Sequence, residues 1–122
     1  MTPYIFLGLP KIKQLNFARG IKEEGLTTET IISAVEKTLF VNNEQMVSSS
    51  RKRPIVIARH IAMFLIRKYS VLPLYQVGLL FGGRDHSTVI YAEKQYEMLY
   101  GIDREFTNSA DVVNKALFLN LK

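Results

Sequence analysis

The chain has 122 residues, 48% of them hydrophobic and none of them cysteine. This length and composition fit one domain with an appendage, and they exclude a wholly disordered chain, a disulfide framework and a thiolate metal site. No apolar run approaches the ~20 residues that span a bilayer, and the apolar start lacks the basic region of a signal peptide. We therefore expect a cytoplasmic protein with no membrane partner.

The net charge of +5 is unevenly distributed along the chain. No acidic residue lies between Glu44 and Asp85, and this interval holds seven of the sixteen lysines and arginines. The rest of the chain has nine cations against eleven carboxylates. One concentrated basic region on a mildly acidic body is typical of a protein that binds a polyanion, although a solvated basic face would give the same pattern.

Residues 1–25 form a predicted N-terminal arm that precedes a predicted domain over residues 26–122. The arm is rich in apolar residues, and glycine and proline at 8–10 and glycine at 20 break any long helix. Two interpretations remain open. The arm either packs back on the helical domain, or it offers a surface for a partner protein or for a second copy of this chain.

The first part of the domain reads as two helices and a loop. A helix is predicted from Leu26 to Phe40, with Thr27 or Thr28 as N-cap and a core face of Ile31, Ile32, Val35 and Leu39. A short helical turn over residues 41–47 follows, with Asn43 as its cap. Residues 48–54 form a polar, basic loop, and we expect Pro54 to hold Arg53 outside the next helix.

That next helix is predicted to run from Pro54 to about Tyr69. Its buried stripe consists of Ile55, Ala58, Ala62, Leu65, Ile66 and Tyr69. His60, Met63 and Arg67 share a different face, and Arg59 lies beside it. The cations of this helix are therefore expected off the core face, where a ligand can reach them.

A helix-turn-helix pattern follows. Leu74–Leu80 reads as a short helix behind Pro73, two glycines at 82 and 83 break the chain, and a second helix begins with a polar first turn. The second helix of such a unit enters the DNA major groove. Gly101 is predicted to end it, and Asp103 to cap a last helix. The core stripe of that last helix is Phe106, Ala110, Val113 and Leu117. The chain is therefore predicted to be all-α, with about six helices.

The polar first turn supplies candidate base contacts from Asp85, His86, Ser87 and Thr88. These side chains can meet donors and acceptors on base edges, and the free N–H groups of the helix N-terminus favour phosphate. Asp85 can also be a plain N-cap, and we expect it to be held by Arg84 or aimed at a base amino group. The two histidines, His60 and His86, lack metal-ligand spacing, and no nucleophile–base or carboxylate pair is visible. An enzyme, a metal site and a cofactor are therefore not expected.

Three segments carry a resemblance to a known family. Gly82-Gly83-Arg84-Asp85-His86-Ser87-Thr88-Val89, Ser50-Arg51-Lys52-Arg53 and Ala58-Arg59-His60-Ile61-Ala62-Met63 resemble the C-terminal DNA-binding domain (domain IV) of the bacterial replication initiator DnaA. The resemblance covers roughly Leu26 to the C-terminus. It implies a Trp-repressor-like helical bundle, here without the ATPase module, since no phosphate-loop motif is present.

The resemblance also implies a role for individual residues. It makes His86 a base-reading residue in the major groove, together with its neighbours, and it places Arg51 in the minor groove. The implied contacts with the DNA backbone come from Lys52, Arg53, Arg59, His60, Arg67, Leu74, Tyr75 and Arg84. Lys52 and Arg53 are equally well read as solvated charges.

This sequence departs from the family pattern at several of these positions. Ser87 stands where the family has threonine, so contact with a thymine methyl should weaken. The family commonly has proline at the position of Tyr75 and often glutamine at that of His60. Arg67 replaces a family lysine.

The predicted function is sequence-specific binding of double-stranded DNA at sites like the DnaA box, in replication initiation or its regulation. The alternative is a protein-interaction adaptor that uses residues 1–25 and whose DNA binding is weakened.

Overall fold

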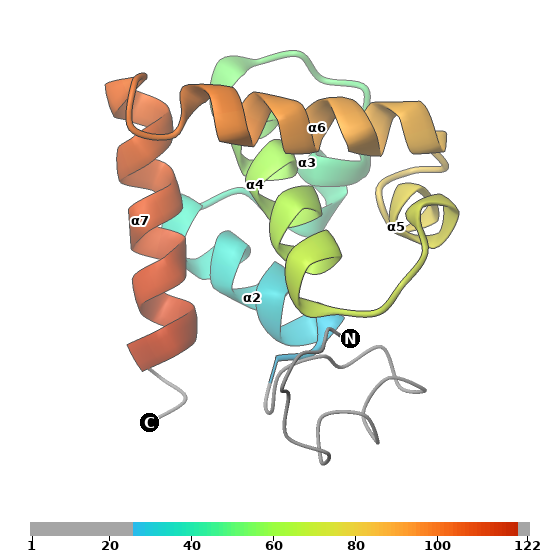
Figure 1. Ribbon diagram of the computed structural model, residues 1–122, viewed down its shortest axis with the longest axis horizontal. Helices are drawn as coiled ribbons and strands as arrows, with labels where there is room; N and C mark the ends of the chain where they lie inside the picture. The colour runs from blue at the N-terminus through green and yellow to red at the C-terminus, as the bar shows by residue number, and fades with distance from the viewer. Residues whose placement is uncertain (1–25, 120–122) are drawn as a thin grey trace.

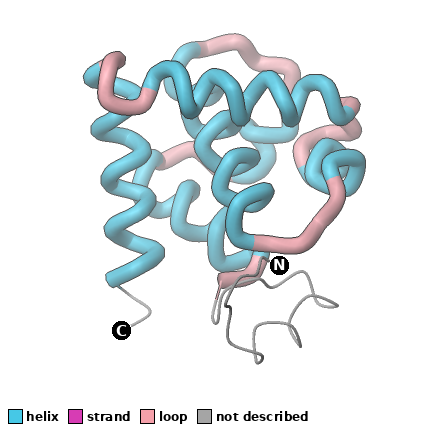
Figure 2. The backbone as a smooth tube through the Cα atoms, in the orientation of Figure 1, coloured by secondary structure: helices cyan, strands magenta, loops and turns pink. Residues whose placement is uncertain are grey.

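The computed structural model describes residues 26–119, and this part of the chain contains six α-helices and no strand (Figures 1 and 2). The all-α prediction is confirmed. None of the helices in residues 26–119 is long and apolar enough to cross a membrane. The helices are α2 (Thr28–Leu39), α3 (Asn43–Val47), α4 (Arg53–Tyr69), α5 (Leu74–Leu80), α6 (His86–Leu99) and α7 (Arg104–Leu119).

The central element is α4, the longest helix, which packs against α2, α3, α5, α6 and α7. Figure 1 shows α6 crossing above α4, with α5 near the start of α6 and α7 near its end. Helix α2 packs on both α4 and α7. The fold therefore presents the first turn of α6 at one edge of the molecule, beside α5.

Helices α2 and α3 begin at side-chain caps. The hydroxyl of Thr27 accepts from the N–H of Thr30 at 3.1 Å, which confirms one of the two predicted caps of α2. The prediction of Asn43 as the cap of α3 is wrong, because the cap is Asn42. Asn42 and Gln45 each accept a hydrogen bond from the other's backbone N–H, at 2.8 and 3.0 Å. This reciprocal box needs an acceptor side chain three residues after the cap, and only Asn42 has one.

The start of α4 corrects a second expectation. Arg53 is the first residue of the helix, and the cap is Lys52, whose carbonyl accepts from the N–H groups of Ile55 and Val56 at 3.0 and 2.9 Å. Proline disfavours helical geometry in the residue before it. Pro54 nevertheless fits at the second position, because the first N–H groups of a helix have no intrahelical acceptor. The helix therefore begins one residue earlier than predicted, and the basic loop ends at Lys52.

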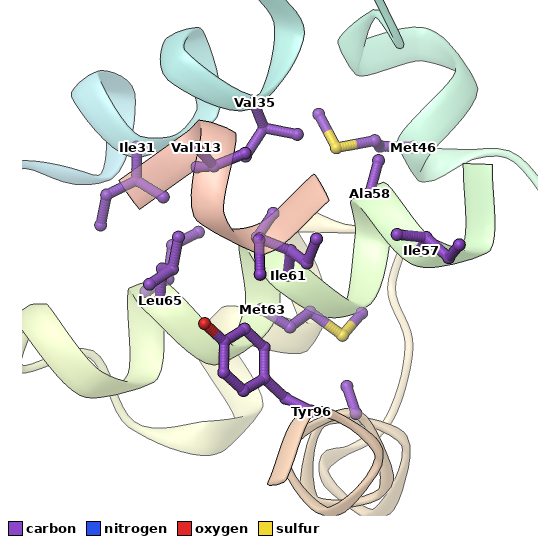
Figure 3. Packing of buried hydrophobic residues seen from close by; sticks show 14 of the residues in the cluster. Ile31, Val35, Met46, Ile57, Ala58, Ile61, Met63, Leu65, Tyr96 and Val113 are labelled. Carbon is purple, nitrogen blue, oxygen red and sulfur yellow. The ribbon is translucent and has the colours of Figure 1, made fainter. Parts of the chain in front are cut away.

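The core forms where α2, α4, α6 and α7 meet (Figure 3). In Figure 3, Ile31 of α2 lies above Leu65 of α4, and Val35 lies beside Val113 of α7 with Ile61 of α4 below them. The predicted stripe of α7 is confirmed, since Phe106, Ala110, Val113 and Leu117 are all buried. Tyr96 of α6 stacks on Phe64 of α4 with ring centroids 3.8 Å apart. This packing fixes the direction of α6 relative to α4.

The prediction that Arg59 and Met63 lie off the core face is wrong. Met63 is fully buried and Arg59 is only 7% exposed. Helix α4 lies between other helices on several sides, so its buried surface is wider than one stripe. Arg59 is tolerated there because backbone carbonyls accept its hydrogen bonds, as described below.

Helices α5 and α6 form the predicted helix-turn-helix. The turn between them includes Gly82 and Gly83, whose φ angles are +87° and +78°. A third glycine, Gly78 inside α5, lies against the backbone that leads into α6. A Cβ at Gly78 would be 1.9 Å from the carbonyl oxygen of Arg84. The carbonyl of Gly78 also accepts from the N–H of Arg84 at 3.0 Å. This close approach sets the spacing of the two helices.

Candidate nucleic-acid interface

The first turn of α6 presents most of the predicted base contacts to solvent. Asp85, His86 and Ser87 are exposed, and Thr88 is half-buried. Asp85 is the N-cap of α6, and its Oδ1 accepts from the N–H of Thr88 at 3.2 Å and from the hydroxyl of Ser87 at 2.6 Å. These hydrogen bonds, with that of Ser87 the strongest, lower the pKa of the Asp85 carboxyl. All the hydrogen bonds that Asp85 accepts from described residues through its side chain fall on Oδ1, so Oδ2 stays open to an outside donor.

Arg84 does not hold Asp85, contrary to one of the two predicted arrangements. Its Nη2 donates to the carbonyl of Ser48 at 2.7 Å, and its Nη1 donates to the carbonyl of Phe81. Arg84 is half-buried, and burial lowers the pKa of its guanidinium. The arginine therefore joins the turn of the helix-turn-helix to the loop that precedes α4. Its predicted contact with phosphate stays a prediction.

The basic loop lies beside this turn and exposes two cations. Arg51 and Lys52 are both exposed. Arg53 donates to Glu105 at 2.7 Å and to Asp103 at 2.9 Å, so it ties the start of α4 to the start of α7. The hydrogen bond to Glu105 and the charge of Asp103 raise the pKa of Arg53. In this arrangement, Arg51 and Lys52 can reach DNA without breaking an ion pair with a described residue, and Arg53 cannot.

Arg59 of α4 donates hydrogen bonds to the backbone of the same loop. Its Nε donates to the carbonyl of Met46 at 2.9 Å, and its Nη2 donates to the carbonyls of Ser48 and Ser50 at 3.1 and 3.0 Å. Burial and the charge of Arg84 lower its pKa. Three of its five N–H groups are used in these bonds. The predicted phosphate contact of Arg59 therefore depends on Nη1 alone.

His60 and Tyr91 lie in a groove between α4 and α6. The groove is lined by Arg51, Arg53, Val56, Ile57, His60, Tyr91, Gln95, Leu99 and Phe106. The rings of His60 and Tyr91 meet edge to face, with centroids 5.8 Å apart, and Tyr91 is 55% exposed. Burial, together with the charges of Arg59 and Arg84, lowers the pKa of His60 to about 4. His60 is therefore neutral at pH 7, and any contact it makes with phosphate is that of a neutral N–H donor.

The remaining predicted contacts are more widely spread. Arg67 is half-buried, and its Nε lies 3.5 Å from Oε2 of Glu93 in α6. Leu74 begins α5 and is half-buried, while Tyr75 is 60% exposed. The structure brings Arg51 and His60 to one groove and Arg84 to the basic loop. Arg67 lies near the C-terminal end of α4, and Leu74 and Tyr75 lie at the start of α5.

Two contributors to the site are missing from the sequence analysis. The carbonyls of residues 46, 48 and 50 hold the two arginines, and backbone acceptors carry no sequence signal. Gly78 sets the approach of α5 to α6. A glycine inside an otherwise helical segment is the signal that could have indicated a close backbone contact there.

The fold and this surface define a helix-turn-helix DNA-binding domain. A short helix, a glycine turn and a helix with an exposed polar tip stand beside a basic loop. The profile of the family described as "Bacterial dnaA protein helix-turn-helix" matches residues 28–95. The chain belongs to this family, and its matched part is a DNA-binding module rather than a catalytic one.

Relatives named "Chromosomal replication initiator protein DnaA" occur in several bacteria. The chain is 33% identical to that of Flavobacterium psychrophilum over 115 residues, which are 94% of this chain and 24% of the relative. It is 33% identical to that of Cutibacterium acnes over 95 residues, 77% of this chain and 19% of the relative. It is 44% identical to that of Gloeobacter violaceus over 72 residues, 59% and 16% respectively. The chain thus spans a quarter or less of the length of these relatives.

The alignment with the Flavobacterium protein bears on the limits of the resemblance. Because it includes 94% of the chain, most of residues 1–25 fall within it. The likeness to this relative therefore begins earlier than Leu26, where the sequence analysis placed it. The predicted roles of residues 1–25, as a packed arm or as a surface for a partner or a second copy, lie outside the described residues.

Proposed function

We propose that this protein recognises a preferred sequence in double-stranded DNA, at sites similar to the DnaA box, and acts in the initiation of replication or in its regulation. The first turn of α6 reads bases in the major groove through Asp85, His86, Ser87 and Thr88. Arg51 enters the adjacent minor groove. The observation that carries this proposal is the exposed tip of α6 after a turn whose Arg84 holds the basic loop, the segment that exposes Arg51 and Lys52.

The positive charge of the basic loop also supports DNA binding by this surface. Arg51 and Lys52 are exposed, and no acidic residue lies between Glu44 and Asp85 in the chain. A surface of this sign attracts the phosphate backbone and holds it through lysine and arginine contacts. Phosphate contacts position a protein on the duplex, while base contacts choose the sequence. The basic loop accordingly positions the protein on the duplex, and the tip of α6 chooses the sequence.

Selection from a random duplex library, followed by titration of the selected duplex against salt, tests this function. We expect one sequence to be enriched. A surface that neutralises about five phosphates gives a slope of log affinity against log salt near −4.5. Lys52→Ala should make the slope shallower by about 0.9, because it removes one phosphate contact. Lys115→Ala, which removes an exposed cation from α7, should leave the slope unchanged.

Enrichment of no sequence, with a steep salt slope, would leave a non-specific DNA-binding protein and refute the sequence-specific part of the proposal. A slope near zero, or no binding at low salt, would refute DNA binding as the function of this surface.

A further inference from the structure

Two arginines that are far apart in the chain converge on one short stretch of backbone. Arg59 of α4 donates to the carbonyls of residues 46, 48 and 50. Arg84, in the turn before α6, donates to the carbonyl of Ser48 at 2.7 Å. The carbonyl of Ser48 thus accepts from both guanidinium groups. These bonds join the loop to α4 on one side and to the helix-turn-helix on the other.

The main chain adds a third connection at the same place. A Cβ at Gly82 would be 2.4 Å from the carbonyl oxygen of Val47. The turn of the helix-turn-helix therefore lies directly against the backbone that leads into the basic loop. Arg51 comes directly after Ser50, whose carbonyl accepts a hydrogen bond from Arg59 at 3.0 Å.

The arrangement brings two positive charges close together, and the charge of Arg84 lowers the pKa of Arg59. Like charges repel, and both guanidinium groups have lost part of their hydration. If the two arginines served only the stability of the fold, positions further apart would be more favourable, because the repulsion between their charges would be weaker. Their common target is the segment that carries Arg51, which indicates a role in placing that segment.

We propose that Arg59 and Arg84 are positioning residues that hold the basic loop at a fixed place relative to α6, so that Arg51 enters the minor groove in register with the major-groove contacts of α6. This inference rests on the proposed function. It replaces the expected phosphate contacts of Arg59 and Arg84 with contacts to the protein backbone, and it makes the readout of the two grooves interdependent.

A double-mutant cycle on the selected duplex tests the coupling. Arg51→Ala should weaken binding about tenfold, as the loss of one specific contact does. Arg84→Gln should weaken it to a similar degree, because Arg51 loses its fixed position. The double variant should bind within about twofold of Arg51→Ala alone, since the two changes remove the same contact. Losses that multiply to about a hundredfold would overturn the proposal and assign Arg84 a DNA contact of its own.

Limited digestion with trypsin tests the positioning without DNA. Trypsin cuts after Arg51 and Lys52, while Pro54 protects the bond after Arg53. Arg84→Gln should speed cleavage after Arg51 and Lys52 several-fold. Cleavage after Lys94 in α6 and the melting temperature should change little, which separates a released loop from global unfolding. Arg104→Gln, which removes an exposed arginine of α7, is the matched control and should be cut after Arg51 and Lys52 at the rate of the unmodified protein.

Unchanged cleavage in the loop of Arg84→Gln would overturn the positioning role. If the unmodified protein bound no duplex, the proposed function would fail, while faster loop cleavage in Arg84→Gln would still support the contact between the turn and the loop.

Discussion

Gly78→Ala should strongly destabilise this domain. The new Cβ would lie 1.9 Å from the carbonyl oxygen of Arg84 and 3.0 Å from its carbonyl carbon. Both atoms belong to the backbone, so no side chain can rotate away, and α5 must separate from the start of α6. Overpacking of this kind costs about 3 kcal/mol. Thermal unfolding should show a melting temperature lower by roughly 10–20 °C.

Gly83→Ala is the matched control for this prediction. Gly83 lies in the turn that follows α5, has a φ of +78° and has nothing within 4 Å of the position of a Cβ. Alanine there meets only the backbone strain of a left-handed residue, about 1 kcal/mol. Equal melting temperatures for the two variants would show that α5 does not approach α6 as closely as described.

His86→Ala should lower affinity for the selected duplex by about 10- to 100-fold, which corresponds to the loss of one base contact of 1–3 kcal/mol. Affinity for random duplex should fall by less than about threefold, because phosphate contacts dominate non-specific binding. His86 is the first residue of α6, is exposed, and follows the cap Asp85, so its removal leaves the N-cap hydrogen bonds in place. Competition between the selected and random duplexes measures both affinities in one experiment.

Met98→Ala is the control on the same helix, because Met98 is also exposed and lies three turns away from the tip. It should leave both affinities within about twofold. Equal losses of affinity for selected and random DNA in His86→Ala would contradict base reading by His86 and assign it to the DNA backbone.

Much of the fold follows from local patterns in the sequence. The spacing of Phe106, Ala110, Val113 and Leu117 places four apolar side chains on one face of α7, and all four are buried. Asp103 was predicted as a cap, and a cap was one of the roles given for Asp85, because an aspartate before a helical pattern satisfies free N–H groups. Both caps are present, and Asp103 accepts from the N–H of Phe106 at 2.9 Å. These features depend on neighbours within one or two turns, so the sequence contains the information needed.

The features that the sequence analysis missed depend on contacts between distant segments. The ion pairs of Arg53 with Asp103 and Glu105 join residues 50 or more positions apart. The bond from Arg84 to Ser48 spans 36 positions and ends on a backbone atom. Arg59 follows Ile55 by four positions and precedes Ala62 by three, so it falls within the apolar stripe of α4. That placement was a signal of burial, and the positive charge of Arg59 outweighed it in the prediction.

The tip of α6 and the basic loop are proposed to bind adjacent grooves of one duplex. Dimethyl sulfate footprinting tests it most directly, because this reagent methylates guanine N7 in the major groove and adenine N3 in the minor groove. On the selected duplex, we predict that the protein protects guanine N7 atoms and, at the neighbouring minor groove, adenine N3 atoms of the same site. Protection in neither groove, or in only one of the two, would contradict the account.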